Sequence, residues 1–487
     1  MKQKTRILAL LLALLMAVAL VGCAQEQTEE PAPTPEAGQD AEQGTEAMDV
    51  DVVIVGAGMS GLMAAYEFET AHPDVTYVVL EKLGYVTGSL PATGGIIAGI
   101  NSQYHEDAGI APATTSDFAD LFEITSKTEV NRELIDNVYA HSDVVLNNLI
   151  EWGAPFITTP EAASVYSDKV YGLRTENRGS TFATFLQNKV EEDGLNILMQ
   201  TTATELIVQD GAVKGVKAES KDKNYEITAD YVLLATGGFG SNAEMIAEYC
   251  PAYTDAMVSS NAGATGDAIT MTEQFGTKVV GEGVMGAPMS TDGNALVTSM
   301  FLVNGKGERF ISEAEPKYVI QSEVVYNQDA TAYYIVDANY SDQEQIQQKV
   351  EAGVLTPYDS LEEMAEDLDM DSATLIATVE AYNAAIDAGT DPEFGLPVAK
   401  ATKIETAPFY ADKMWHRFFG TIPGVEINND CQVLNGEGAP VPGLYASGEA
   451  TAGNAFTYQY PGAGIGISYA ANSGRLAAEN IANALQK

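Results

Sequence analysis

The hydrophobic pattern near residue 50 predicts a strand, a turn and a helix in close succession. Val50 to Val55 is a run of β-branched apolar residues interrupted only by Asp51, typical of a strand buried in a parallel sheet. The sequence GAGMSG at 56–61 follows directly, and apolar residues at helical spacing come after it. A second apolar strand, Thr76 to Leu80, ends at Glu81. This order predicts a βαβ unit with a glycine-rich turn between its first strand and its helix.

The glycine-rich turn has the spacing of a dinucleotide-binding site. Gly56 permits the tight turn, Gly58 lets the backbone approach a pyrophosphate, and Gly61 lets helix and strand pack closely. Free N–H groups at the start of the helix bind phosphate. Glu81 follows Gly61 by 20 residues, where an acid binds the ribose hydroxyls. These features together indicate a bound dinucleotide, and both NAD and FAD are bound by such a unit.

The later strands favour FAD. The segment 196–238 predicts a β-meander with a hairpin turn at Asp210-Gly211, followed by an apolar strand from Tyr231 to Ala235 that ends in TGG. Near the C-terminus another strand runs into Gly448 and Glu449, and a last helix is expected to begin around Gly464. This pattern resembles the flavoproteins with two dinucleotide folds, in which the ATGG strand end passes beside FAD.

The N-terminal pattern differs from the rest of the chain. Three basic residues precede an apolar run of 15 residues, Ile7 to Val21, shorter than the ~20 residues of a membrane-spanning helix. The run ends in LVGC, which resembles the bacterial lipobox, in which the cysteine is acylated. We therefore expect a lipoprotein signal peptide at 1–22, lipidation at Cys23, and an extracytoplasmic protein anchored to the cell membrane by lipid only. The alternative is a plain signal peptide with an incidental cysteine.

Composition and charge narrow the function further. The 487 residues include 69 acids and 25 Lys and Arg, a formal net charge of −44, which excludes nucleic-acid binding through basic patches. Residues 23–48 are polar and rich in Pro and Glu, and predict a disordered tether. No haem or iron–sulfur motif is present, and the four histidines lack metal-ligand spacing, so we predict no metal. Cys250 and Cys431 are expected to be buried thiols, although sequence does not exclude a disulfide between them.

Seven motifs follow one another along the chain: the segments 56–61, Glu81, 89–95 (SLPATGG), 235–238, 265–267, 303–313 (VNGKGERFISE) and 443–449. Their order and spacing resemble those of the FAD-binding fumarate reductase/succinate dehydrogenase flavoprotein family, which includes urocanate reductases and 3-ketosteroid dehydrogenases. The resemblance implies non-covalent FAD held by Gly56, Gly58, Gly61, Glu81, Ser89, Gly95, Asp267, Glu449, Gly464 and Ile465.

The resemblance also implies the domain organisation. The fold class is α/β, a Rossmann-like FAD-binding domain with two dinucleotide folds and an inserted α+β capping domain. The FAD-binding domain is expected at 49–299 and 420–487, with the capping domain at 300–419 and the active site in the cleft between them.

Departures from the family alter the expected substrate. The family's proton-donating arginine is expected after the strand at 332–337, and the stretch 338–342 has no Arg. Phe419 or Gly420 stands where the family has His, and Gln459 where it has Arg. Without these cations a dicarboxylate would be bound more weakly, so a simple dicarboxylate substrate is not expected.

Tyrosines are the candidate replacements. Tyr340, Tyr460 and Tyr318 are the candidate proton donors, with Tyr340 favoured because its loop follows the strand at 332–337. A phenol donates a proton or polarises a carbonyl without adding charge. Each of them could instead be a packing residue, and His416 with Arg417 forms a second candidate pair.

We therefore expect an FAD-dependent oxidoreductase acting on CH–CH groups. It would reduce a C=C bond activated by a carbonyl, in an enone or enoate, with hydride from flavin N5 and a proton from a tyrosine. A separate membrane-associated donor would supply electrons. The alternatives are a 3-ketosteroid-type dehydrogenase acting in reverse and a flavin electron-carrier lipoprotein without a substrate of its own.

Overall fold

The computed structural model describes residues 44–487. The predicted signal peptide, the lipidation site Cys23 and most of the predicted tether lie outside the described residues. No helix in the described part is long and apolar enough to span a membrane.

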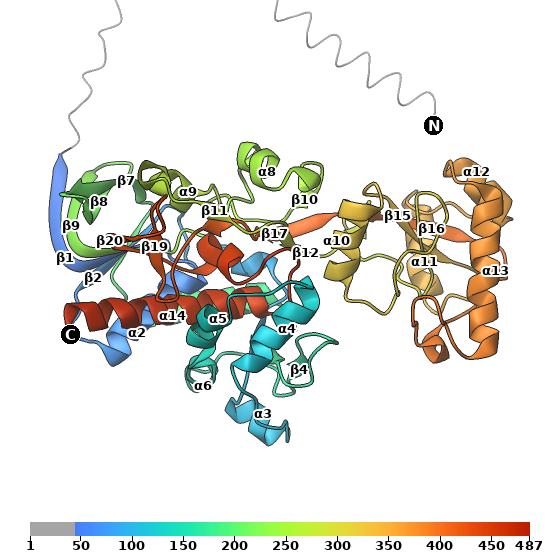
Figure 1. Ribbon diagram of the computed structural model, residues 1–487, viewed down its shortest axis with the longest axis horizontal. Helices are drawn as coiled ribbons and strands as arrows, with labels where there is room; N and C mark the ends of the chain where they lie inside the picture. Colours follow the sequence, from blue (N-terminus) through green and yellow to red (C-terminus); the bar gives the residue numbers. More distant parts are fainter. Residues whose placement is uncertain (1–43) are drawn as a thin grey trace, which may run out of the picture. The chain divides into compact units, whose positions relative to one another are not determined.

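The core of the described chain is an eight-stranded sheet (Figure 1). Its main path runs β19-β20-β9-β1-β2-β6, and the β7–β8 hairpin extends it by pairing β8 with β9. The neighbours β20, β9, β1, β2 and β6 are all parallel to one another. Its strands are β1 (Thr45–Val55), β2 (Tyr77–Glu81), β6 (Ile197–Met199), β7 (Thr202–Gln209), β8 (Ala212–Glu219), β9 (Asn224–Leu234), β19 (Gln432–Leu434) and β20 (Pro440–Ala446).

The first strand begins earlier than its composition suggested. The tether was expected to extend to residue 48, whereas β1 begins at Thr45. Thr45 to Asp49 pair with Asn224 to Thr228 of β9, and Glu46 forms an ion pair with Lys223. Backbone pairing at the exposed end of a strand needs no apolar side chains, so the hydrophobic pattern gave no sign of it.

The hairpin turn predicted at Asp210-Gly211 is present in the structure. Asp210 and Gly211 both have positive φ, 52° and 80°, as a two-residue type I′ turn requires, and they join β7 to β8. The predicted meander is confirmed.

Two helices meet the central sheet close to each other (Figure 1). α2 (Met59–Ala71) follows β1, and α14 (Ile465–Leu485) begins after Gly464, as predicted. They approach so closely that a Cβ added at Gly474 of α14 would lie 2.1 Å from the carbonyl oxygen of Ser60 in α2. The other helices outside the cap are α3 (Gln103–Asp107), α4 (Ser116–Ser126), α5 (Arg132–Tyr139), α6 (Ser142–Glu151), α7 (Gly179–Asp193), α8 (Ala243–Tyr249) and α9 (Asp267–Thr272).

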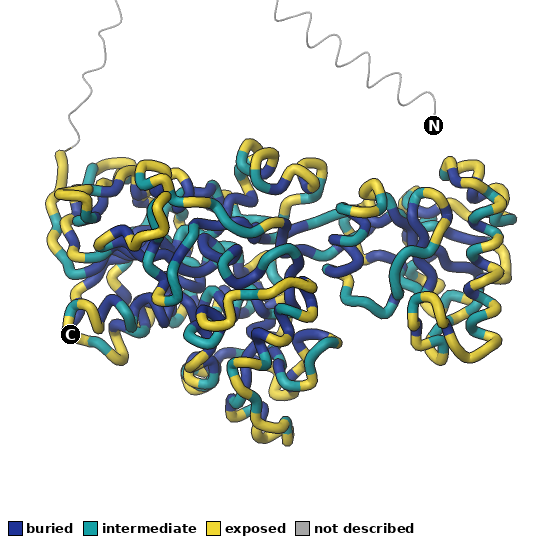
Figure 2. Tube along the Cα trace, in the orientation of Figure 1, coloured by how far each residue is buried: buried dark blue, intermediate teal, exposed yellow. Residues whose placement is uncertain are grey.

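A second α+β unit, the cap, has its own four-stranded sheet and hydrophobic clusters. Figure 2 shows buried backbone along its strands and exposed backbone on its outer helices. Its elements are β13 (Met289–Ser290), β14 (Leu302–Asn304), α10 (Lys317–Asn327), β15 (Ala332–Val336), α11 (Gln343–Glu351), α12 (Leu361–Asp367), α13 (Ser372–Ala388) and β16 (Tyr410–Trp415).

A buried ion cluster stabilises the cap. Arg309 contacts Glu313 at 2.7 Å and Asp391 at 2.9 Å, and its guanidinium lies over the rings of Tyr382 and Phe394. The guanidinium group of Arg309 therefore makes these contacts within the cap and has a structural role there.

The strands refine the expected cap boundaries. The cap sheet includes β13, before residue 300, and ends at Trp415. The next strand, β17 (Arg417–Thr421), pairs instead with β10 (Met257–Val258) and β12 (Val284–Gly286). The chain thus leaves the cap between Trp415 and Arg417.

The remaining short strands are β3 (Ile96–Gly99), β4 (Glu161–Ala162), β5 (Tyr171–Arg174), β11 (Val279–Val280) and β18 (Gly424–Val425).

Cys250 and Cys431 are both free and buried. Burial raises the pKa of each thiol to about 12. They are therefore structural thiols, and the disulfide that the sequence left open is absent.

Candidate active site

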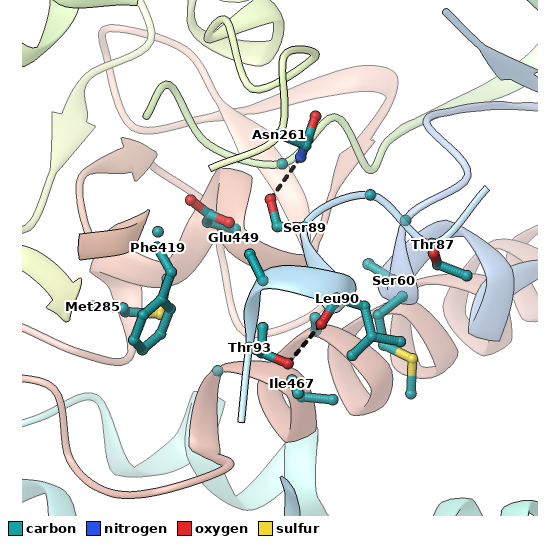
Figure 3. Close-up of a pocket in the computed structure, with 18 of the residues that line it drawn as sticks. Ser60, Thr87, Ser89, Leu90, Thr93, Asn261, Met285, Phe419, Glu449 and Ile467 are labelled. Atoms are coloured by element: carbon teal, nitrogen blue, oxygen red, sulfur yellow. Dashed lines mark hydrogen bonds between the residues drawn. The ribbon is translucent and has the colours of Figure 1, made fainter. Parts of the chain in front are cut away.

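One large pocket opens at the carboxyl ends of β1 and β2, beside the first residues of α2 and α14 (Figure 3). A crevice at this edge of a parallel sheet is the usual ligand site of doubly wound folds. Side chains from β17 and from α10 of the cap complete its lining.

The glycine turn forms the floor of the pocket. Gly58 lines it, has an ordinary φ of −74°, and a Cβ added there would meet nothing within 4 Å. Gly56, with φ of 109°, also lines it, whereas a Cβ on Gly61 would lie 1.9 Å from the carbonyl oxygen of Gly56. Gly61 therefore allows the packing of helix on turn, and Gly58 leaves room for a ligand.

Glu81 lies at the end of β2 with both carboxylate oxygens bonded. Its oxygens accept hydrogen bonds from the backbone N–H of Ala57 at 2.9 Å and of Leu83 at 2.7 Å. Burial raises the pKa of this carboxyl group, and these two bonds oppose the rise. Glu81 thus joins the strand end to the glycine turn and faces the pocket.

Asp267 reaches the pocket through a partner that the sequence analysis missed. Lys82 donates hydrogen bonds to Asp267 and to Thr265, each at 2.7 Å, and both Lys82 and Asp267 line the pocket. The position of Lys82 next to Glu81 was the only available signal.

The SLPATGG segment folds over the pocket near the turn. Ser89 lines the pocket and accepts a hydrogen bond from Asn261 Nδ2 at 2.6 Å (Figure 3). Gly95 lies beneath the lining, with φ of 66°, and a Cβ there would lie 2.4 Å from the carbonyl carbon of Arg178. Asn261 and Arg178 are further lining residues that no motif had indicated.

Glu449 enters the pocket from the segment after β20. It accepts hydrogen bonds from the N–H of Thr421 at 2.8 Å and from its hydroxyl at 3.2 Å. Burial raises the pKa of Glu449 to about 7, and the bonds to Thr421 partly offset this rise. The carboxyl group is therefore poised between its neutral and charged forms near pH 7.

The N-terminus of α14 faces the same pocket. Gly464 and Gly466 line it, and Gly466 donates its N–H to the phenol oxygen of Tyr460 at 3.0 Å. Ile465 is completely buried in the core and supports the turn from behind. The positive end of the helix dipole favours negative charge here.

Aromatic side chains gather at this end of the pocket. Tyr318, Tyr460 and Phe419 all line it, and the ring of Tyr460 lies 5.7 Å from that of Tyr318 and 6.1 Å from that of Phe419. Burial raises the pKa of Tyr318 to about 12 and that of Tyr460 above its usual range. Both phenols therefore remain protonated at neutral pH.

Two of the candidate catalytic residues lie elsewhere. Tyr340, favoured from the sequence, lines a separate cavity within the cap, and its hydroxyl lies 3.4 Å from Gln345 Oε1. His416 is bonded through Nε2 to the carbonyl of Ala330 and does not line the large pocket. Arg417, the other member of the second pair, does line it.

Residues 51–467 match the FAD binding domain family. The chain is 31% identical over 430 residues to a urocanate reductase of Eggerthella lenta, covering 82% of this chain and 70% of that protein. It therefore belongs to the FAD-binding fumarate reductase/succinate dehydrogenase flavoprotein family. It is also 27% identical over 486 residues to an NADH:acrylate oxidoreductase of Vibrio harveyi, covering 83% of this chain and about half, 48%, of that protein.

Solved structures share the fold. An open conformation of a flavocytochrome c3 fumarate reductase superposes with a TM-score of 0.69 at 25% identity, covering 90% of this chain and 78% of that one. A 3-ketosteroid Δ1-dehydrogenase from Sterolibacterium denitrificans superposes with a TM-score of 0.75 at 20% identity, and the match covers 90% of this chain and 100% of that one. The predicted α/β fold with a cap is confirmed.

The pocket fits FAD, and the chain is an FAD-dependent oxidoreductase. The open space over Gly58 and the uncapped start of α2 suit a pyrophosphate, and Glu81 faces the pocket at the strand end where a ribose is bound. Of the ten residues predicted for FAD, the lining includes Gly56, Gly58, Glu81, Ser89, Asp267, Glu449 and Gly464. Gly61, Gly95 and Ile465 lie behind it and shape the backbone.

Proposed function

We propose that this protein reduces carbon–carbon double bonds conjugated to a carbonyl group, in enones or enoates. Bound FAD, once reduced by an electron donor, would supply a hydride to the β-carbon of such a substrate. The observation that carries the proposal is the pair of neutral phenols, Tyr318 and Tyr460, at the end of the pocket where α14 begins. Reductases of urocanate and acrylate among the relatives support the same reaction class.

Tyr460 is the proton donor in this proposal. Its oxygen already accepts the N–H of Gly466, and among the described residues no acceptor takes its own proton. The proton is therefore available for the α-carbon of a substrate. The N–H of Gly466 would stabilise the phenolate that remains.

Tyr318 has a supporting role. Its hydroxyl lies 3.1 Å from Ser164 Oγ and 3.3 Å from the carbonyl oxygen of Pro461, so its proton is held by the protein. Its ring closes the aromatic end of the pocket against Tyr460. Such a ring orients an unsaturated substrate and excludes water.

We further propose that FAD is bound without a covalent link, because no His lies in the segment before Gly94 and Gly95. The basic and apolar leader before Cys23 supports an extracytoplasmic, lipid-anchored protein. The chain has no haem or iron–sulfur motif, which is consistent with electrons from a separate membrane-associated donor.

The reverse reaction is the second candidate, because the ketosteroid dehydrogenase shares this fold and the pocket carries two tyrosines. A panel experiment separates the candidates. Anaerobically reduced protein is mixed with enones, enoates, cinnamates and steroid enones, and reoxidation of the flavin is followed. Rapid reoxidation with a saturated product supports the reductase. Reduction of the oxidised flavin by a saturated ketosteroid, without reoxidation by any of these compounds, would favour the dehydrogenase instead.

A further inference from the structure

Two arginines in the pocket differ from the other arginines of the described chain. Arg132, Arg174, Arg309 and Arg475 each form an ion pair with an acid. Within residues 44–487, neither Arg178 nor Arg417 has a hydrogen bond or ion pair to its side chain. The chain has 69 Asp and Glu residues, so two arginines without an acidic partner are unusual in it.

The two side chains lie close enough to repel each other. Burial, and then the charge of Arg178, lower the pKa of Arg417. The Nε of Arg417 is buried without any acceptor. A buried charge-bearing donor without a partner costs free energy, and an anion bound at Arg417 would supply that partner. The same anion would offset the repulsion from Arg178, which is exposed.

The position of the pair decides which anion fits. Arg417 and Phe419 are two residues apart on β17, so they face the same side, and both line the pocket. Phe419 packs against Tyr460, so the pair lies at the aromatic end. The backbone of Arg178 itself packs against Gly95, where an added Cβ would lie 2.4 Å from the Arg178 carbonyl carbon, whereas the phosphate-binding turn at Gly58 packs against Gly88. An anion bound here would therefore belong to the substrate and not to the FAD pyrophosphate.

We infer that Arg178 and Arg417 bind the carboxylate of the substrate, which makes the substrate an unsaturated monocarboxylate with an apolar or aromatic group on its β-carbon. The guanidinium groups bind the carboxylate, and the rings of Phe419, Tyr318 and Tyr460 contact the apolar group. This inference rests on the proposed function and deepens it. The two arginines would take the place of the cations whose absence had made a dicarboxylate substrate unexpected.

The test compares ligands that differ only in charge. Holoenzyme with oxidised FAD is titrated with 3-phenylpropanoate and with the neutral 3-phenylpropanamide, and binding is followed by the change in the flavin visible spectrum. We expect the carboxylate to bind at least ~10-fold more tightly. Arg178→Gln and Arg417→Gln should each remove most of that preference, and Arg417→Lys should restore part of it. Arg132→Gln, at an ion-paired arginine that does not line the pocket, is the matched control and should leave it unchanged.

Turnover gives the second readout. Cinnamate should reoxidise the reduced flavin with a KM at least ~10-fold lower than that of cinnamamide, and the Arg→Gln variants should raise KM for cinnamate alone.

Equal binding of acid and amide by the wild type, or unchanged preference in both variants, would overturn the inference while leaving the reductase proposal intact. A shift in flavin midpoint potential without a change in carboxylate binding would also overturn it, by assigning the pair to the flavin. Failure of every C=C compound to reoxidise the flavin would instead reject the proposed function, and the binding titration would still decide the role of the pair.

Discussion

Tyr460 is the proposed proton donor, whereas Tyr340 was the residue favoured from the sequence. Tyr460 lines the flavin pocket and its proton has no acceptor among the described residues, whereas Tyr340 lies in the cap cavity beside Gln345. We predict that Tyr460→Phe keeps FAD and is reduced by dithionite, yet reoxidises with substrate ~10²-fold or more slowly, because a positioned acid contributes about that factor. Stopped-flow absorbance of the flavin measures the rate.

Tyr340→Phe is the matched control and should react within a few-fold of the wild type. A slow Tyr340→Phe beside a normal Tyr460→Phe would return the donor to the cap and would require the cap cavity to open onto the substrate.

Glu449 gives a pH-dependent prediction. Its pKa of about 7 lies above the value of 4.5 for a free Glu, so between these pH values the folded state binds more protons than the unfolded state. The stability contributed by the protonated carboxyl is present below pH 4.5 and is lost as pH rises through 7. In FAD-depleted protein, the free energy of unfolding should therefore fall by on the order of 1–3 kcal/mol more over this window than in Glu449→Gln.

Urea unfolding of both proteins at several pH values measures the difference. Parallel pH profiles of wild type and Glu449→Gln would contradict the raised pKa.

At the scale of elements, the turn between β1 and α2 has two glycines with different tasks. A Cβ at Gly58 meets nothing, whereas a Cβ at Gly61 would lie 1.9 Å from the Gly56 carbonyl oxygen. We predict that Gly58→Ala folds with a Tm near that of the FAD-free wild type but binds FAD at least ~10-fold more weakly, because the methyl group occupies the pyrophosphate site. Gly61→Ala should be destabilised by about 1–3 kcal/mol, the usual cost of overpacking a close contact.

Thermal unfolding with and without added FAD separates these effects. Normal FAD affinity in Gly58→Ala would show that the pyrophosphate lies elsewhere.

Elements defined by local chemistry were predictable from the sequence. The strand and glycine turn at 50–61, the Asp210-Gly211 hairpin and the start of α14 depend on neighbouring residues, and all three are present. The extension of β1 to Thr45 depends on pairing with β9, which the pattern of one segment does not contain.

Site residues that depend on long-range contacts were missed for the same reason. Arg178 and Arg417 lie 239 positions apart in the sequence, and only the fold brings them to one pocket. Tyr340 was favoured because its loop follows a particular cap strand, but that loop opens into a different cavity. Sequence motifs found the cofactor, whereas the substrate end required the folded structure.

At the scale of the whole molecule, the leader predicts the location of the protein. Cys23 follows a basic and apolar segment, so we predict acylation at Cys23 and retention on the outer face of the membrane. Cys23→Ala should release the protein or leave it unprocessed, as cell fractionation and the mass of the N-terminal peptide would show. A processed Cys23→Ala protein that stays on the membrane would contradict the lipid anchor.

The central claim is that the FAD pocket reduces carbonyl-activated double bonds. The most direct measurement is an anaerobic titration of the fully reduced flavin with cinnamate, followed by flavin absorbance and by mass spectrometry of the product. The account predicts one equivalent of oxidised FAD and one of 3-phenylpropanoate for each equivalent of cinnamate added. A flavin that stays reduced with excess cinnamate and with every other enoate and enone would contradict it.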